Sequence, residues 1–291
     1  TWLMGGEREQ IINAVSQAFV DGQPLRTYRH APNTGSRKSW AAGDATARGV
    51  LLALMSCKGE MGYPSVLTAP TWGFYEVLFK GQPFRLSRRY GSYVIENVLF
   101  KISFPAEFHA QTAVECAVEL HSQVRGRIDG IARVLIRTHE SALRIIDKQG
   151  PLFNPADRDH CLQYMVAVAL IKGRLTSEDY EDAAASDPRI DDLRAKIEVR
   201  EEPRFSADYL DPSKRSIANA VQVVFADGSR TAELVSEYPL GHCRRRAEGI
   251  PVLVEKFRAH LARRFSPAQQ GRIEESSRDV YQLGTLAVHD Y

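Results

Sequence analysis

The sequence predicts a mainly helical protein with an inserted α+β domain. Three observations support this fold class: helical spacing of apolar residues dominates both ends of the chain, strand-like and helix-like segments alternate in the middle, and the pair at 227–228 (DG) separates two short apolar runs as in a β-hairpin. We therefore expect residues 1–97 to be part of a large helical domain and residues 98–238 to form the inserted α+β domain. Residues 239–291 are expected to be a helical tail that packs on the large domain.

Three helices are predicted in the first part. The first contains apolar positions 11, 12, 15, 18 and 19 and ends at the turn sequence 21–24 (DGQP). The second covers 39–57 and carries many alanines and glycines before the apolar stretch 50–54, which indicates close packing between neighbouring helices. The third covers 71–79 and is closed by Gly81 and Pro83.

The middle part combines both kinds of element. Residues 93–102 have the β-branched and aromatic character of a strand, and strands are also expected at 131–136 and 196–200. Helices are expected at 110–124, at 156–172 and, as a solvated acidic helix, at 178–192. The hairpin joins 221–225 to 231–235, and the tail is expected to contain helices over 250–265 and from Pro267 onward.

Composition limits the classes of function. The 291 residues carry a formal net charge of +2 with acids and bases interspersed, which gives no reason to expect binding to nucleic acid or to a membrane surface. The longest apolar run, 165–171, is too short to span a bilayer. Nothing at the N-terminus has the pattern of a signal peptide, so we expect a cytoplasmic protein that binds a small molecule.

The cysteines do not form a local metal motif. They stand at positions 57, 116, 161 and 243, with no CxxC pair and no histidine at zinc-finger spacing. We interpret them as small core residues of a protein in a reducing compartment, and we predict no metal site.

A first candidate site lies at residues 35–40 (GSRKSW). The cations Arg37 and Lys38 stand just before a predicted long helix, whose unpaired N–H groups and positive dipole end attract anions. A carboxylate or phosphate would bind well there. The alternative is a solvated loop capped by Ser36 or Ser39.

A second candidate site is the pair Glu107 and His109, which opens the predicted helix 110–124. The positive end of a helix dipole disfavours the imidazolium, so His109 would be available as a neutral base near neutral pH. The alternative is a histidine that only caps or packs, with Glu107 as an ordinary first-turn acid.

Weaker candidates for the site stand after the predicted strand 131–136 and farther along the chain. His139 and Glu140 come at the end of that strand, but no HExxH zinc motif is present, because no second histidine follows at the required spacing. We rank His139 and His160 below Lys38 and His109. The basic run 244–246 is interpreted as solvated rather than as a nucleic-acid site.

Several long segments resemble the MmgE/PrpD family. They are 37–45 (RKSWAAGDA), 65–74 (SVLTAPTWGF), 89–111 (RYGSYVIENVLFKISFPAEFHAQ) and 238–242 (YPLGH), and they match in order over essentially the whole chain. The resemblance implies a two-domain architecture: a large helical domain built from both ends of the chain, an inserted smaller α+β domain, and an active site between the two. It also implies a homodimer.

The resemblance further implies an activity. It points to the branch that removes water from 2-methylcitrate to give 2-methylaconitate, in the bacterial disposal of propionyl units, with no iron–sulfur cluster and no other cofactor. Lys38 matches the family's active-site lysine. In the related decarboxylase branch a histidine occupies the motif that matches 104–107, whereas this chain has Glu107 there and His109 two residues later, which favours the dehydratase branch.

These parts give a set of expected site residues. Lys38 and His109 are predicted to be catalytic, with the division between acid and base left open. A tricarboxylate carries about three negative charges near neutral pH, so its pocket needs several cations. The residues expected to bind this substrate are Arg37, Arg88, Arg89, Glu107 and His139.

Two alternatives stay open. One is a tricarboxylate decarboxylase or epimerase of the same family, because fold alone does not decide the reaction. The other follows from the longer helical segment that family members carry before the point matching Thr1. On that hypothesis the chain is a C-terminal portion that binds anions without turnover.

Overall fold

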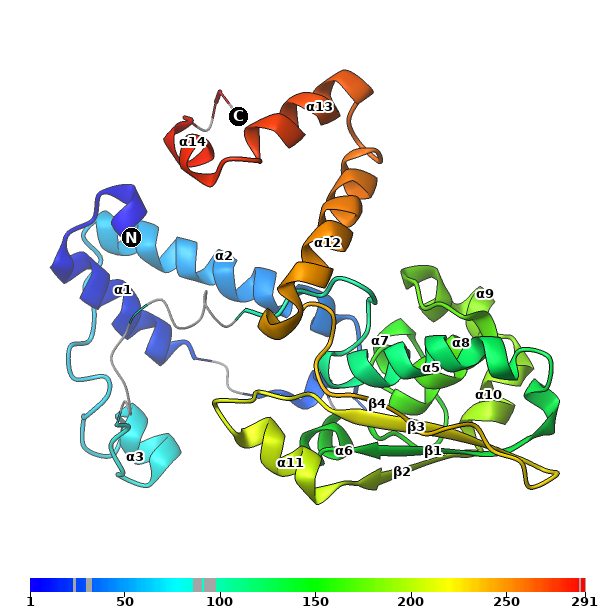
Figure 1. Cartoon of the computed structure of the whole chain (residues 1–291). Helices are drawn as coiled ribbons and strands as arrows, with labels where there is room; N and C mark the ends of the chain where they lie inside the picture. Colours follow the sequence, from blue (N-terminus) through cyan, green and yellow to red (C-terminus); the bar gives the residue numbers. More distant parts are fainter. Residues whose placement is uncertain (23–24, 30–32, 86–90, 92–97, 288, 291) are drawn as a thin grey trace. The chain divides into compact units, whose positions relative to one another are not determined.

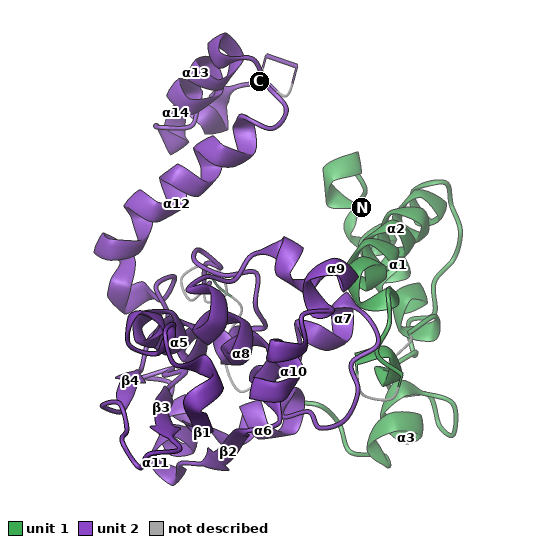
Figure 2. Cartoon of the chain, turned by 90° about the vertical axis from the view of Figure 1, so that its right-hand side faces the viewer, with its two compact units in different colours: residues 1–92 green, residues 93–291 purple. Residues whose placement is uncertain are grey.

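Two groups of elements make up the chain in the computed structural model, residues 1–92 and residues 93–291, which Figure 2 colours separately. The structure describes residues 1–22, 25–29, 33–85, 91, 98–287 and 289–290 (Figure 1). The predicted boundaries at 97 and 238 stay predictions, as does the packing of the tail on the N-terminal helices.

The first unit contains the helices α1 (Arg8–Val20), α2 (Arg37–Cys57) and α3 (Phe74–Phe79), and the short 3-10 turns η1 (Trp2–Met4) and η2 (Thr27–Arg29). Helix α1 begins at a capping box in which the Glu7 N–H donates to Gln10 Oε1 at 2.8 Å. Helix α2 begins at Arg37, two residues before the predicted start, so both cations of the first candidate site lie inside its first turn. Helix α3 is shorter than predicted because residues 71–73 form turns.

The second unit is built on a four-stranded sheet in the order β2-β1-β3-β4. Strand β1 (Ile131–Thr138) pairs in parallel with β2 (Ile197–Glu201) and antiparallel with β3 (Asn219–Phe225), which pairs antiparallel with β4 (Leu234–Ser236). The predicted hairpin is confirmed: Gly228 adopts a φ of 84° in the turn, and the Phe225 N–H donates to the Ser229 carbonyl at 2.8 Å.

Helices α5 (Gln111–Val124), α8 (Leu162–Lys172) and α10 (Pro188–Arg194) cover one face of this sheet (Figure 1). Residues 162–170 of α8 are all buried, so this helix has no polar face and forms the centre of the core. The core therefore lies between α8, α5 and the sheet, where Val134, Ile136 and Val223 are fully or almost fully buried.

Two predicted helices of this unit are wrong in detail. The helix expected at 156–172 is divided into α7 (Pro155–Arg158) and α8, because Asn154 caps a separate first turn that ends before Cys161. The acidic helix expected at 178–192 is three short pieces, η5 (Ser177–Tyr180), α9 (Asp182–Ala185) and α10. Pro188 starts the last of them, and Asp179 is buried rather than solvated because Lys172 and Thr176 donate to its carboxylate.

The strand expected at 93–102 lies partly outside the described residues. Residues 93–97 lie outside the described part of the chain, and residues 98–102 form no strand. Three elements that the sequence did not signal are the 3-10 turn η4 (Ile128–Gly130) and the helices α6 (Glu140–Ile146) and α11 (Pro203–Leu210). Helix α11 starts with Pro203 behind the capping side chain of Glu202 and packs its Phe205 against Ala218 and Ala220.

The tail consists of η6 (Cys243–Arg245), α12 (Arg246–Leu261), α13 (Pro267–Ser276) and α14 (Val280–Thr285). Its first residues are tied to the second unit, since Arg245 pairs with Glu115 of α5 at 2.8 Å and Arg246 donates to the Val98 carbonyl at 3.1 Å. None of the described helices combines the length and apolar character needed to cross a bilayer.

Gly173 gives a stability prediction for this fold. It ends α8 with a φ of 67°, and a Cβ there would lie 2.6 Å from Cδ2 of His121. We expect Gly173→Ala to lower the free energy of unfolding by about 1–2 kcal/mol or more, because a left-handed backbone is strained for any residue with a Cβ. Urea unfolding measures the loss. Gly126→Ala is the control, since Gly126 has an ordinary φ and no heavy atom near its missing Cβ; equal losses in both variants would contradict the explanation.

Candidate functional site

Four polar or aromatic side chains from separate stretches of the second unit lie together. Glu107 is the N-cap of the 3-10 turn η3 (Phe108–Ala110) ahead of α5, and His109 lies within that turn. His139 follows β1 as the N-cap of α6, and Tyr209 lies in α11. The centroid of the His109 ring lies 5.1 Å from the centroid of the His139 ring and 5.6 Å from that of the Tyr209 ring. We call this group of four residues the histidine cluster.

The backbone of this turn is held from two sides. The Glu107 carboxylate accepts the His109 N–H at 2.8 Å and so caps the turn. Asn219, the first residue of β3, donates from Nδ2 to the His109 carbonyl at 2.8 Å. The position of the imidazole is therefore fixed both by the cap and by the sheet.

The side chains of Glu107 and His109 form a directed pair. His109 Nδ1 lies 2.9 Å from Oε1 and 2.8 Å from Oε2 of Glu107, while its Nε2 lies 3.2 Å from the Tyr209 hydroxyl. An ionised carboxylate only accepts hydrogen bonds, so Nδ1 carries a proton and the lone pair of the neutral ring is on Nε2. With the ring in this neutral form, the Tyr209 O–H is the donor to Nε2.

Glu107 stays ionised in this environment. Burial by itself disfavours the carboxylate, but the hydrogen bonds that it accepts from the His109 side chain and backbone outweigh it, and the pKa of Glu107 lies below its usual 4.5. An ionised partner on Nδ1 stabilises the imidazolium that forms when Nε2 takes a proton. The pair is therefore suited to general acid–base chemistry.

His139 is the most enclosed member of the cluster. It is 0% exposed and stacks on the Tyr209 ring at 4.5 Å with an interplanar angle of 7°. Neither of its ring nitrogens has a hydrogen-bond partner within the part of the chain that the structure describes. Burial, together with the nearby His109, lowers its pKa from 6.5 to about 4. His139 is thus a neutral ring at pH 7, placed behind Tyr209 rather than at a surface.

This burial predicts a pH dependence of stability. Because the pKa of His139 is about 4 in the folded state and near 6.5 in the unfolded state, the unfolded chain binds a proton first as pH falls through this window. The contribution of the neutral His139 to the free energy of unfolding is fully present above pH 6.5. It falls by about 3 kcal/mol as the pH decreases to 4. His139→Phe keeps the stack on Tyr209 but cannot titrate, so its unfolding free energy should fall less between pH 7 and pH 4.

Urea unfolding at both pH values tests this expectation. His260→Phe is the control, since His260 is exposed on α12. The control should lose stability like the unaltered protein, and an equally large loss in His139→Phe would show that His139 does not cause the acid dependence.

The first candidate site, in the other unit, has a different character. Lys38 is half-buried in the first turn of α2, where its own N–H donates to the Gly35 carbonyl at 3.1 Å and the Ser39 N–H donates to the Ser36 carbonyl at 2.9 Å. Neighbouring Arg37 pairs with Asp44 at 2.8 Å, and its guanidinium lies 4.3 Å from the centre of the Trp40 ring. These contacts neutralise part of the Arg37 charge.

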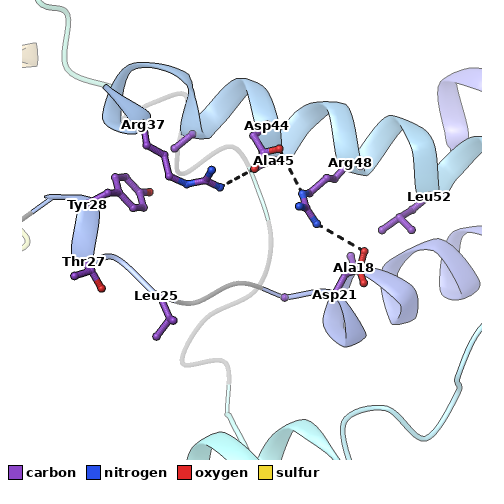
Figure 3. A pocket seen from close by; sticks show the side chains of 13 residues that line it. Ala18, Asp21, Leu25, Thr27, Tyr28, Arg37, Asp44, Ala45, Arg48 and Leu52 are labelled. Atoms are coloured by element: carbon purple, nitrogen blue, oxygen red, sulfur yellow. Dashed lines mark hydrogen bonds and ion pairs between the residues drawn. The ribbon is translucent and has the colours of Figure 1, made fainter. Parts of the chain in front are cut away.

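Arg37 also lines a cavity of about 640 Å³ within this unit. Figure 3 shows Asp44 between Arg37 and Arg48, with Arg48 reaching on to Asp21 and Tyr28 lying opposite. The cavity is thus lined by alternating charges, and a ligand with carboxylates would compete with Asp44 for Arg37.

The described residues of the predicted site lie in two separate groups. Glu107, His109 and His139 lie together in the second unit, and Lys38 and Arg37 lie together in the first. Arg88 and Arg89 lie outside the described residues. Among the described residues, no group of three or more His, Cys, Asp or Glu side chains is arranged to hold a metal ion.

Sequence reasoning missed Tyr209. It stands 100 positions after His109, on a helix that was not predicted, and no local motif marks it. Only the three-dimensional contact with Nε2 identifies it.

Comparison with known proteins establishes the family. Residues 1–87 match the MmgE/PrpD N-terminal domain and residues 104–281 match the MmgE/PrpD C-terminal domain. The chain belongs to the MmgE/PrpD family, which confirms the family resemblance and the predicted class of fold: mainly helical with an inserted α+β domain.

Individual relatives are also similar. The chain is 64% identical over 292 residues to the 2-methylcitrate dehydratase of Salmonella typhimurium and 64% identical over 293 residues to that of Cupriavidus necator. It is 60% identical over 285 residues to the mitochondrial 2-methylcitrate dehydratase of Yarrowia lipolytica. These alignments cover 99%, 99% and 97% of this chain but 60%, 60% and 55% of the relatives, so the chain spans somewhat more than half their length.

Proposed function

We propose that this chain is part of a hydro-lyase that dehydrates 2-methylcitrate to 2-methylaconitate. The observation that carries the proposal is the Glu107–His109 pair, with Nδ1 held by an ionised carboxylate and Nε2 left as the site of proton transfer. The printed names of the relatives supply the substrate.

The chemistry requires two proton movements. A proton leaves the carbon next to a carboxylate, and the departing hydroxyl takes up a proton as the C–O bond breaks. His109 serves as the base for the first step or as the acid for the second, and Glu107 stabilises its charged form. An imidazole with its lone pair on Nε2 is suited to the first role.

Cations are needed for the same reaction. Loss of the proton adds negative charge to the neighbouring carboxylate, and fixed cations stabilise this state more than the ground state. We assign this role to Lys38, supported by the N–H groups of the first turn of α2. Arg37 binds a second carboxylate by exchanging Asp44 for the substrate.

The remaining parts of the proposal come from the family resemblance. They are a reaction without a metal or iron–sulfur cluster, a cytoplasmic location, a homodimer, and a place in the disposal of propionyl units. Arg88 and Arg89 are proposed as further cations around the tricarboxylate, and His139 as a support of the site that lies behind Tyr209.

Product analysis tests the proposal. The natural gene product that contains this chain is incubated with 2-methylcitrate, citrate and cis-aconitate, and the products are identified by NMR. We expect 2-methylaconitate from 2-methylcitrate. Release of carbon dioxide from cis-aconitate would indicate a decarboxylase, inversion without loss of water an epimerase, and binding without any product an anion-binding protein.

A further inference from the structure

We propose that Tyr209 is a positioning residue that keeps Nε2 of His109 unprotonated and correctly directed before the substrate binds. The inference rests on the proposed function for its catalytic meaning, but the contact itself can be tested without any turnover. It assigns a role to a residue that no sequence motif marks.

Each ring nitrogen of His109 has its own hydrogen-bond partner. Both carboxylate oxygens of Glu107 lie within 2.9 Å of Nδ1, so this side of the imidazole is fully engaged. On the other side the Tyr209 hydroxyl lies 3.2 Å from Nε2. A phenol donating to Nε2 is compatible with the neutral ring only, since the imidazolium has no lone pair there.

The phenol ring of Tyr209 is held in place by its neighbours. Its ring lies flat on His139, which is fully buried and makes no other polar contact with its ring nitrogens. The helix that carries Tyr209 is anchored next to it, because Phe205 packs into the sheet and Asp208 pairs with Lys214. Tyr209 therefore cannot turn away from His109 without breaking the stack.

Several titratable groups lie around His109. The titratable groups that face it are Glu107 from its own turn, His139 from the end of β1 and Tyr209 from α11. His160, paired with Asp159 at 3.0 Å, lies close enough for its charge to act on Glu107. Glu107 favours the imidazolium, so the donor on Nε2 is the group that opposes early protonation.

The consequence is a division of tasks across one ring. Glu107 holds the Nδ1 side of the ring, and the Tyr209 hydroxyl, 3.2 Å away, holds Nε2 in one direction. The His109 side chain as a whole is 12% exposed. A substrate that displaces the phenol then meets an unprotonated, oriented Nε2.

Tyr209→Phe tests the inference because it removes the hydroxyl and keeps the ring that stacks on His139. The His109 imidazole is followed by NMR titration of histidine-labelled natural gene product without substrate. We expect the midpoint for His109 to rise by about half to one pH unit in the variant, as one hydrogen bond to the neutral form is lost. Tyr281→Phe, at an 85% exposed tyrosine, is the control and should leave the midpoint unchanged.

The pH profile of kcat/KM for 2-methylcitrate is the second readout. The acidic limb should move to higher pH by the same amount, with a smaller change in KM than in kcat at low pH. An unchanged NMR midpoint in Tyr209→Phe would overturn the inference outright. If the midpoint rose while the acidic limb stayed in place, the catalytic role of Tyr209 would be wrong; if the unaltered protein made no 2-methylaconitate, the failure would be that of the proposed function, and the NMR midpoint would still decide the contact.

Discussion

His109→Ala is expected to lower kcat for 2-methylcitrate by about 10²- to 10⁴-fold, the usual contribution of a general acid or base. His109 is the only member of the histidine cluster with an ionised carboxylate on one nitrogen and an exchangeable hydroxyl partner on the other. KM should change much less, because the imidazole is engaged mainly in the transition state. Steady-state kinetics of the natural gene product measures both constants.

The control for this variant is His260→Ala. His260 is exposed on α12 and should leave kcat unaltered. Glu107→Gln is a useful companion, since it keeps the shape of the side chain but removes the charge that stabilises the imidazolium. A His109→Ala enzyme that retained near-normal kcat would rule out His109 as the acid or base.

Lys38→Ala is expected to lower kcat by about 10²- to 10³-fold, similar to the loss of one fixed donor to a developing negative charge. The half-buried side chain lies in the first turn of α2, where the helix dipole adds to its field. Because a carboxylate of the bound substrate also contacts this cation, KM should rise as well. The measurement is again steady-state kinetics with 2-methylcitrate.

Lys58→Ala is the matched control, since Lys58 follows the C-terminal end of the same helix and is exposed. Its activity should equal that of the unaltered protein. If Lys38→Ala and Lys58→Ala behaved alike, the proposed role of Lys38 would be wrong.

The regular elements of the fold follow closely from local patterns. Helices α1 and α2 and strands β1, β2 and β3 lie within a few residues of their predicted positions, because spacing of apolar residues reports directly on which face is buried. The division of 156–172 into α7 and α8 was not predicted. The largely apolar sequence of α8 predicts a helix with or without a break before it, and the cap at Asn154 decides where the break falls.

The candidate site was predictable only where its residues are neighbours in the sequence. Glu107 and His109 are two positions apart, so a local reading of the helix start finds both. The burial of His139 and the contact of Tyr209 depend on how β1, α6 and α11 come together, and no local pattern carries that information. The pairing of Arg37 with Asp44 is likewise a result of the helix register, since the two stand seven positions apart on α2.

Formation of the conjugated enoate, followed by ultraviolet absorbance when the natural gene product meets 2-methylcitrate with and without EDTA, tests the central claim most directly. The account predicts steady formation at the same rate in both conditions, and its near-complete loss in His109→Ala. Absence of the enoate with the unaltered protein, or activity that EDTA abolishes, would contradict a metal-independent dehydration that depends on the Glu107–His109 pair.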